Sequence, residues 1–196
     1  MQNNTNPNTV LRQVLLQKRK ALSLEQRTSL SEQLVSLLVS CIQRHTDGVA
    51  KRIAAFWPIG EELDIKPALY ELSRLGHTIS LPKVAQLDAP LEFYVWTENA
   101  PMQAGHYNIP EPALTERAST PDIVLVPVLG FTMFGDRLGY GKGYYDRTLA
   151  QWQEMGHYPY TLGLAWDEGL IEDCTYQAAP HDVPLSAILT PSGFKC

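Results

Sequence analysis

The segment between Gly135 and Arg147 has the composition of a loop that binds phosphate groups. Its glycines alternate with other residues at positions 139, 141 and 143. Glycine tolerates a positive φ and lets the backbone approach a ligand closely, and backbone amides next to a helix N-terminus favour phosphate oxygens. Arg137 and Lys142 add positive charges, as a bidentate fork and as a mobile point charge. On glycine spacing alone, a plain flexible turn is an equal alternative.

Two well-known phosphate-binding motifs do not fit this segment. A P-loop requires G-x-x-x-x-G-K-[ST], but the residue five after Gly135 is Tyr140, and Lys142 is followed by a glycine. A dinucleotide fingerprint, G-x-G-x-x-G, fails because Tyr144 or Asp146 stands where its last glycine belongs. The motifs of zinc proteases and α/β-hydrolases are absent too. The segment therefore predicts phosphate binding of a different kind.

Asp146 and the tyrosines before it could extend this chemistry. A carboxylate just inside the helix after a phosphate-binding loop is well placed to hold Mg²⁺, which takes one or two protein carboxylates together with phosphates and waters. An equal alternative is that Asp146 only complements the helix N-terminus, worth about 0.3–1 kcal/mol. Tyr144 or Tyr145 could stack on a ring-shaped ligand, although paired aromatic residues at a helix start more often belong to the core.

The elements that must position this segment alternate between strands and helices. A β-branched apolar run at 122–127 predicts a buried strand, and ligands of open α/β sheets bind beyond the carboxyl ends of strands, where the glycine-rich segment would lie. Further strands are expected at 53–57, 78–81 (ended by Pro82), 91–96, 160–165 and 187–190, and helices at 10–21, from 24 into the forties, at 66–75 and from 143 to about 152. This order predicts a single α/β domain: a mostly parallel sheet flanked by helices, Rossmann-like and three-layered, with a helical N-terminal segment.

The net charge of -5 hides an asymmetry along the chain. Residues 1–52 hold eight basic and three acidic side chains, a balance of +5, so residues 53–196 carry -10. The cations of the acid-free stretch up to residue 24 are Arg12, Lys18, Arg19 and Lys20. Such a stretch suggests that the first helix meets something negative, and a solvated basic face is an equal alternative. Ser23, with Gln26 three positions later, has the capping-box pattern that starts a helix.

Composition excludes several functional classes. With 21 acidic against 16 basic residues, the chain lacks the high positive charge typical of nucleic-acid-binding domains. Three scattered cysteines, Cys41, Cys174 and Cys196, favour neither disulfides nor a zinc site and fit a reducing cytosol. The polar residues 1–8, expected to be flexible, lack the apolar core of a signal peptide, and no segment approaches about 18 uninterrupted apolar residues. We therefore expect a cytoplasmic protein that binds neither membranes nor nucleic acids.

The glycine-rich segment resembles the signature of the 5-formyltetrahydrofolate cyclo-ligase family, also called methenyltetrahydrofolate synthetases. The resemblance rests on the run GDRLGYGKGYYDR at 135–147, which is highly specific. Individually weaker similarities lie at residues 11–23, 60–64, 108–112, 163–167 and 181–185. They extend the resemblance across essentially the whole chain and imply one cyclo-ligase-like domain over residues 1–196.

The reaction that this resemblance implies is an ATP-dependent ring closure. In the family, the formyl oxygen of 5-formyltetrahydrofolate takes the γ-phosphoryl group of MgATP, nitrogen 10 attacks the activated carbon, and phosphate leaves, giving 5,10-methenyltetrahydrofolate and ADP. ATP and 5-formyltetrahydrofolate are then the substrates, Mg²⁺ is the cofactor, and no obligate protein partner is implied. Phosphoryl transfer requires mainly positioning and charge neutralisation, which Arg137 and Lys142 could provide.

The resemblance also implies roles for individual residues. The ATP-binding set consists of Arg12, Arg137, Leu138, Gly139, Tyr140, Gly141, Lys142, Gly143, Tyr144 and Tyr145. The folate-binding set consists of Trp57, Glu62, Tyr107, Tyr140, Gly141, Lys142, Gly143 and Tyr144. The catalytic residues would be Arg137, Lys142 and Tyr144, and the Mg²⁺ ligands Asp146 and Asp182. Without the resemblance, Glu62 is better explained as a solvated turn carboxylate, and Asp182 equally well as a surface acid before Pro184.

One departure from the family pattern bears on nucleotide binding. The family commonly has a lysine four positions before the residue that matches Arg12, and this chain has Asn8 there. Either Lys18 or Arg19 compensates, or nucleotide affinity is lower. Two other hypotheses stay open: a folate- or nucleotide-binding module without turnover, and a sugar-phosphate isomerase, since similar α/β folds host phosphate sites for many reactions. For the histidines at 106 and 181, a solvated or capping role is favoured over catalysis.

Overall fold

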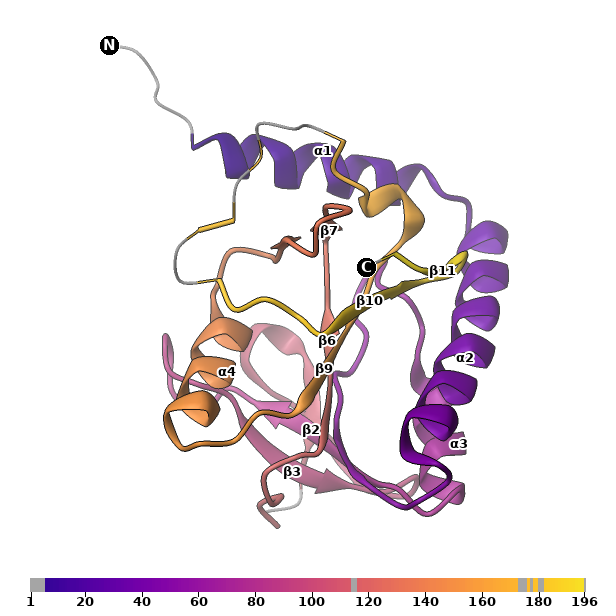
Figure 1. The fold of residues 1–196 in the computed structure, drawn as a ribbon, viewed down its shortest axis with the longest axis vertical. Coiled ribbons are helices and arrows are strands. Elements are labelled where there is room, and N and C mark those ends of the chain that lie inside the picture. Colours follow the sequence, from indigo (N-terminus) through magenta and orange to yellow (C-terminus); the bar gives the residue numbers. More distant parts are fainter. Residues whose placement is uncertain (1–5, 114–115, 173–175, 177, 180–181, 196) are drawn as a thin grey trace.

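A seven-stranded sheet forms the middle layer of the structure, a computed structural model that describes residues 6–113, 116–172, 176, 178–179 and 182–195. The strand order is β11-β10-β9-β6-β1-β2-β3 (Figure 1). The five central strands are parallel, and β3 and β11 join antiparallel at the two edges. The strands are β1 (Arg52–Ala54), β2 (Thr78–Lys83), β3 (Glu92–Trp96), β6 (Ile123–Pro127), β9 (Tyr160–Leu164), β10 (Ala187–Thr190) and β11 (Gly193–Phe194). The predicted mostly parallel α/β fold is confirmed.

Helices cover both faces of this sheet. Along β6, Ile123 and Leu125 belong to the core that α2 (Leu24–Thr46) and α3 (Lys66–Arg74) complete, whereas Val124 and Val126 belong to the core beneath α4 (Tyr144–Glu154). Figure 1 shows α4 on one side of the sheet and α2 with α3 on the other. A strand buried on both faces has apolar residues at consecutive positions, which is why this run was recognisable in the sequence.

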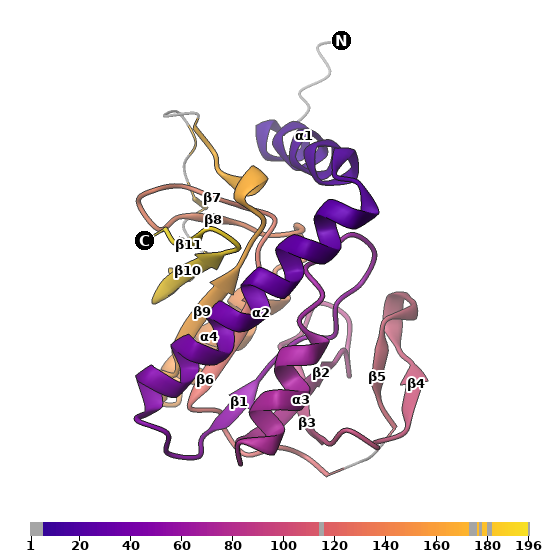
Figure 2. The same cartoon turned by 90° about the vertical axis from the view of Figure 1, so that its right-hand side faces the viewer.

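Helix α1 (Pro7–Ala21) lies across the end of the sheet at which β6 terminates (Figures 1 and 2). It begins three residues before the expected residue 10 because the side chain of Asn6 accepts a hydrogen bond from the amide of Asn8 (2.9 Å), and because Pro7 suits the first helical position. Of residues 1–8, for which a flexible start is expected, Pro7 and Asn8 are helical, while residues 1–5 lie outside the described residues.

The other helices begin close to their predicted positions. At the start of α2, the Ser23 hydroxyl accepts from the Gln26 amide (3.1 Å) while the Gln26 side chain accepts from the Ser23 amide (2.8 Å), so the predicted capping box is confirmed. Helix α4 begins at Tyr144 after Gly143, one residue later than expected. In the part of the chain that the structure describes, no helix is long and apolar enough to cross a membrane.

Strand ends and short hairpins account for the differences from the predicted elements. β1 ends at Ala54, and β2 continues through Pro82 to Lys83 instead of ending before the proline. The proline is tolerated because β1 accompanies β2 only as far as Ser80, so that β2 has a single neighbouring strand beyond it. Strands of two or three residues, which are too short to show a hydrophobic period, form two unpredicted hairpins. These are β4 (Met102–Ala104) with β5 (Pro110–Pro112), and β7 (Gly130–Phe131) with β8 (Arg137–Leu138).

Candidate active site

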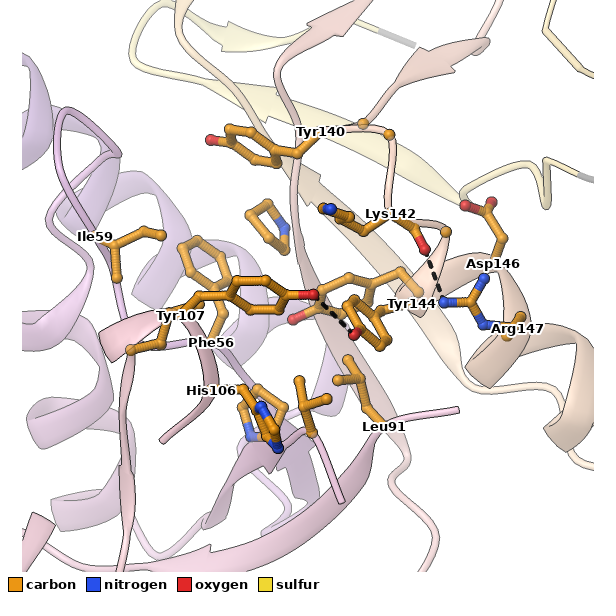
Figure 3. Close-up of a pocket in the computed structure, with 18 of the residues that line it drawn as sticks. Phe56, Ile59, Leu91, His106, Tyr107, Tyr140, Lys142, Tyr144, Asp146 and Arg147 are labelled. Carbon is orange, nitrogen blue, oxygen red and sulfur yellow. Dashed lines mark hydrogen bonds between the residues drawn. The ribbon is translucent and has the colours of Figure 1, made fainter. Parts of the chain in front are cut away.

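A pocket of about 600 Å³ opens at the carboxyl ends of the central strands (Figure 3). Its walls are residues at or just after the ends of β1, β2 and β6, the loop 137–143 with the start of α4, and the turn that joins β4 to β5. The residues expected at the ATP, folate and metal sites all line it: Arg12, Trp57, Glu62, Tyr107, Arg137, Leu138, Gly139, Tyr140, Gly141, Lys142, Gly143, Tyr144, Tyr145, Asp146 and Asp182. The structure therefore brings together side chains that are up to 170 residues apart in the sequence.

Two glycines of the loop 137–143 occupy conformations that other residues rarely adopt. Gly141 has a φ of 88° and Gly143 a φ of 67°. Space is also short, because a Cβ atom on Gly141 would lie 3.1 Å from Cζ of Arg12, and one on Gly143 would lie 2.9 Å from Nη1 of Arg147. Gly143 is the N-cap of α4 and supplies no capping side chain. The first amides of that helix are thus available to an anion.

Helix α1 supports this loop from one side. Nε of Arg12 donates a hydrogen bond to the carbonyl oxygen of Gly139 (2.9 Å), and Leu15 packs against Leu138. Lys18 and Lys20 are exposed on the same helix. Each of the two interpretations of the basic stretch therefore describes part of it: some cations meet electronegative groups of the pocket, and others form a solvated face.

Arg137 lies beneath the loop and pairs with the carboxylate of Asp146. The two side chains are 5% and 14% exposed, and Nη2 of Arg137 donates to Oδ1 of Asp146. The same oxygen accepts from the amide of Val183 (3.2 Å), whose carbonyl accepts from Nε of Arg137 (3.3 Å). This network joins α4 to the segment that carries Asp182. The guanidinium expected to face phosphates is thus engaged with a carboxylate of the same pocket.

The hydrogen bond from the Val183 amide to Asp146 brings together the two segments that carry the candidate metal ligands. Asp146 lies in the first turn of α4, and Asp182, one residue before Val183, lines the same pocket. Oδ2 of Asp182 accepts a hydrogen bond from the amide of Ala179 (2.8 Å). Within the described residues, no group of three or more histidine, cysteine or acidic side chains is arranged to hold a metal. A cation here would rely on two carboxylates and on oxygens of a ligand or water.

Aromatic rings and one carboxylate form the opposite side of the pocket. Trp57 packs against Trp96 at a centroid distance of 6.1 Å. Tyr107 has a φ of 60°, and its hydroxyl lies 3.4 Å from that of Tyr144, while Nζ of Lys142 lies 5.6 Å from the centre of its ring (Figure 3). This side of the pocket offers flat apolar surfaces to a ring-shaped ligand.

Glu62 is the carboxylate on this side. Its Oε2 accepts a hydrogen bond from the amide of Ile59 (3.0 Å), and its side chain also interacts with the hydroxyl of Tyr140. Burial raises the pKa of the Glu62 carboxyl, and the interaction with the Tyr140 hydroxyl, the hydrogen bond from the Ile59 amide and the charge of Arg19 oppose that rise. Glu62 does belong to a turn, as the simpler interpretation proposed, but it faces the pocket rather than open solvent.

Tyr145 differs from its neighbour Tyr144. Its hydroxyl oxygen is buried and has no hydrogen-bond partner among the described residues. Burial raises the pKa of this hydroxyl far above its usual value, so it stays protonated and can donate. A buried hydroxyl without a partner is rare in folded proteins, and in a ligand pocket it is suited to meet a polar atom of the ligand.

Several pocket residues were absent from the sequence predictions. They are Phe56, Ile59, Pro82, Val84, Leu91, His106, Ile109, Glu111, Pro127, Arg147 and Ala150. Phe56 and Pro127 could have been identified from their places at the ends of predicted strands. His106 and Ile109 could not, because the unpredicted β4–β5 hairpin brings them to the pocket. His181 lies outside the described residues.

The fold and the pocket define a class of protein. A three-layer α/β fold, with a pocket at the carboxyl edge of its sheet that joins a glycine-rich loop and helix N-terminus to aromatic rings and a carboxylate, is the arrangement of an enzyme acting on small ligands. The chain belongs to the 5-formyltetrahydrofolate cyclo-ligase family, a family of ligases, whose model matches residues 4–191.

Curated relatives and solved structures agree with this assignment. The 5-formyltetrahydrofolate cyclo-ligase of Escherichia coli K12 is 31% identical over 187 residues, which cover 91% of this chain and 97% of the relative. The mouse protein of the same name is 29% identical over 191 residues, 91% of each chain. The structure of 5,10-methenyltetrahydrofolate synthetase from Aquifex aeolicus matches with a TM-score of 0.78 and 29% identity, covering 96% of this chain and 91% of that one. The synthetase from Mycoplasma pneumoniae matches with a TM-score of 0.74 and 26% identity, covering 94% and 99%.

Proposed function

We propose that this protein converts 5-formyltetrahydrofolate to 5,10-methenyltetrahydrofolate with conversion of MgATP to ADP and phosphate. The observation that carries the proposal is that one pocket joins two chemically different halves: a glycine-rich loop with a helix N-terminus, and aromatic rings with a half-buried carboxylate. The first half suits a polyphosphate, and the second suits a pterin ring that carries hydrogen-bond donors. The volume of the whole pocket, about 600 Å³, lies within the usual range for small-molecule sites. A cytoplasmic location is part of this proposal.

At the phosphate half, the protein's task is to orient ATP and neutralise its charge. Positive groups gather at the loop 137–143. They are the first amides of α4, the exposed side chain of Lys142, which belongs to the loop, and the guanidinium of Arg12. The formyl oxygen attacks the γ-phosphorus and ADP leaves. Nitrogen 10 then attacks the formyl carbon, the bond from that carbon to the phosphorylated oxygen breaks, and phosphate departs with the proton that nitrogen 10 loses. Fixed positive groups stabilise the charge that moves between oxygens during these steps.

Mg²⁺ fits the carboxylates at the edge of this half. Asp146 and Asp182 would hold the ion, a donor set that suits Mg²⁺ because this ion keeps several waters and nucleotide oxygens as ligands. When bound with ATP, the ion would neutralise phosphate charge. Arg137 would position Asp146, because its buried guanidinium donates a hydrogen bond to Oδ1 of this carboxylate. The other oxygen, Oδ2, takes no part in that hydrogen bond or in the one from the Val183 amide.

At the folate half, Glu62 would accept hydrogen bonds from the donor edge of the pterin. Trp57, Tyr107 and Tyr144 would pack on the ring system, and Tyr107 and Lys142 lie where the two halves meet. The Tyr145 hydroxyl, buried without a partner among the residues that the structure describes, would donate to an oxygen of the bound substrates.

The proposal is tested by incubating the purified protein with 5-formyltetrahydrofolate and MgATP and following the near-ultraviolet absorbance of the methenyl product. We expect product only when ATP is present, and loss of turnover when EDTA removes the divalent cation, with recovery on addition of excess Mg²⁺. Binding of both ligands without product would indicate a binding module instead. ATP-independent turnover of a sugar phosphate would indicate an isomerase.

Replacing Gly143 by alanine is expected to raise the KM for ATP about tenfold. A non-glycine residue in a left-handed conformation costs roughly 1–2 kcal/mol, and here the new Cβ would also lie 2.9 Å from Nη1 of Arg147, so that either this side chain or the loop must shift. Gly156→Ala is the matched control, because Gly156 also has a positive φ (76°) but has open space around it. Steady-state kinetics at saturating folate should show the change in Gly143→Ala alone; an unchanged KM there would contradict the role of this loop.

A further inference from the structure

Arg19 is a buried cation that the reaction scheme above does not use. It lies on α1 and is only 4% exposed, although it stands between the exposed Lys18 and Lys20. Nη1 donates a hydrogen bond to the hydroxyl of Tyr140 (2.6 Å), and Nη2 donates to the carbonyl oxygen of Val128 (3.3 Å). Charged residues are almost never buried to this extent unless they are paired, so the burial of Arg19 requires an explanation.

The position of Arg19 on α1 directs it to the pocket. Arg12, Leu15 and Arg19 are spaced by three and four residues and therefore share one face of the helix. Leu15 packs closely against Gly130, since a Cβ on this glycine would lie 2.5 Å from Cδ1 of Leu15. This contact anchors the helix beside the pocket. With this anchor between them, the two arginines reach adjacent residues of the loop, the carbonyl of Gly139 and the side chain of Tyr140.

Tyr140 connects Arg19 to Glu62. Burial and the nearby charge of Glu62 raise the pKa of the Tyr140 hydroxyl far above its usual value, so the hydroxyl keeps its proton. It accepts from Arg19 through its oxygen and can donate that proton toward the Glu62 carboxylate. The Ile59 amide holds the carboxylate as well (3.0 Å). A carboxylate has about four acceptor positions, so two internal donors leave positions for a ligand.

We propose that Arg19 is a positioning residue for folate recognition: it fixes the hydroxyl of Tyr140, which in turn orients the Glu62 carboxylate toward the pterin. This inference rests on the proposed function, in which Glu62 binds the donor edge of the ring. Arg19 also supplies a balancing positive charge to a carboxylate that is half-buried. Its effect therefore belongs to the folate half of the pocket rather than to the phosphate half.

The test is a double-mutant cycle on the full chain with Arg19→Met, Tyr140→Phe and the combination. Each single change removes the same hydrogen bond, which involves a charged group, so each should raise the KM for 5-formyltetrahydrofolate about tenfold. The double variant should be hardly worse than either single one, because the interaction is already lost. The KM for ATP should rise less than about twofold in Arg19→Met, and Arg19→Lys should recover part of the folate affinity.

Lys20→Met is the matched control, since it removes an exposed cation from the same helix by the same change. Denaturant unfolding of every variant separates loss of folate affinity from loss of fold. An active wild-type protein whose Arg19→Met variant keeps its folate KM, loses ATP and folate affinity equally, or combines additively with Tyr140→Phe would overturn this inference alone. A wild-type protein that neither turns over nor binds 5-formyltetrahydrofolate would overturn the proposed function, and this inference with it.

Discussion

Replacing Asp146 by asparagine is expected to lower kcat by about 10²–10³, with little change in folate affinity. The substitution keeps the size of the side chain and an oxygen that can accept from Arg137 and from the Val183 amide. It removes the negative charge that we assign to Mg²⁺, and the loss of one electrostatic contribution to a transition state has an effect of this size. The measurement is kcat at saturating ATP and folate, with folate binding followed by titration calorimetry. A variant with a normal ATP-dependent rate would remove Asp146 from the metal site.

A stability measurement separates this effect from the structural role of the same carboxylate. Asp146→Ala should lower the free energy of unfolding by about 3–5 kcal/mol, because it leaves the guanidinium of Arg137, 5% exposed, without its partner. Adding Arg137→Met to Asp146→Ala should restore part of that free energy, since the unpaired cation is gone. Activity should not return with it. If the double variant were as active as Arg137→Met alone, Asp146 would act only through the ion pair.

Replacing Lys142 by methionine should raise the KM for ATP about 10- to 100-fold, the largest such change among the pocket residues. The reason is that a hydrogen bond to a charged group contributes about 1.5–3 kcal/mol, and the exposed ammonium group of Lys142 belongs to the loop 137–143, to which we assign the phosphates. Because this side chain is exposed, stability should change by no more than about 0.5 kcal/mol.

Lys18→Met provides the matched control for Lys142, since Lys18 is an exposed lysine outside the pocket. Initial rates over a series of ATP concentrations, at one saturating folate concentration, distinguish the two variants. If the two showed the same KM for ATP, the loop would owe its phosphate binding to its amides alone.

The layers of the fold could be predicted because their physical causes are local. The run at 123–126 is apolar on both faces of the strand, and the pairing of Ser23 with Gln26 indicates the start of α2 within four residues. The β7–β8 hairpin could not be predicted, because each strand has two residues and only the pairing of Gly130 with Leu138 defines it. The passage of β2 through Pro82 depends on which strand lies beside it, and a single run of sequence does not contain that information.

The candidate site also has features that the sequence indicates and features that it does not. The loop 137–143 is a continuous segment, so its glycines and cations indicate a phosphate site without knowledge of the fold. Arg137 and Asp146 are nine residues apart, and one lies before α4 and the other within it. The sequence alone does not indicate whether these two side chains pair with each other or both contact a ligand. The contact of Arg19 could not be predicted either. In the sequence Arg19 is one cation in a basic run, and its partner Tyr140 lies 121 residues away.

The docking of α1 also affects the order in which the protein folds during translation. Leu15 packs in one cluster with Leu129, Leu138 and Ile171, so α1 is synthesised long before the residues that form its binding surface. The strands β1 and β2 are close in sequence and can pair well before that point. The strands β1, β2, β3 and β6 can therefore pair during translation, while α1 and the pocket, which needs both arginines of α1, must wait for residue 171, and β10 and β11 follow later still. A nascent chain stalled before residue 171 should be folded in part and unable to bind its ligands.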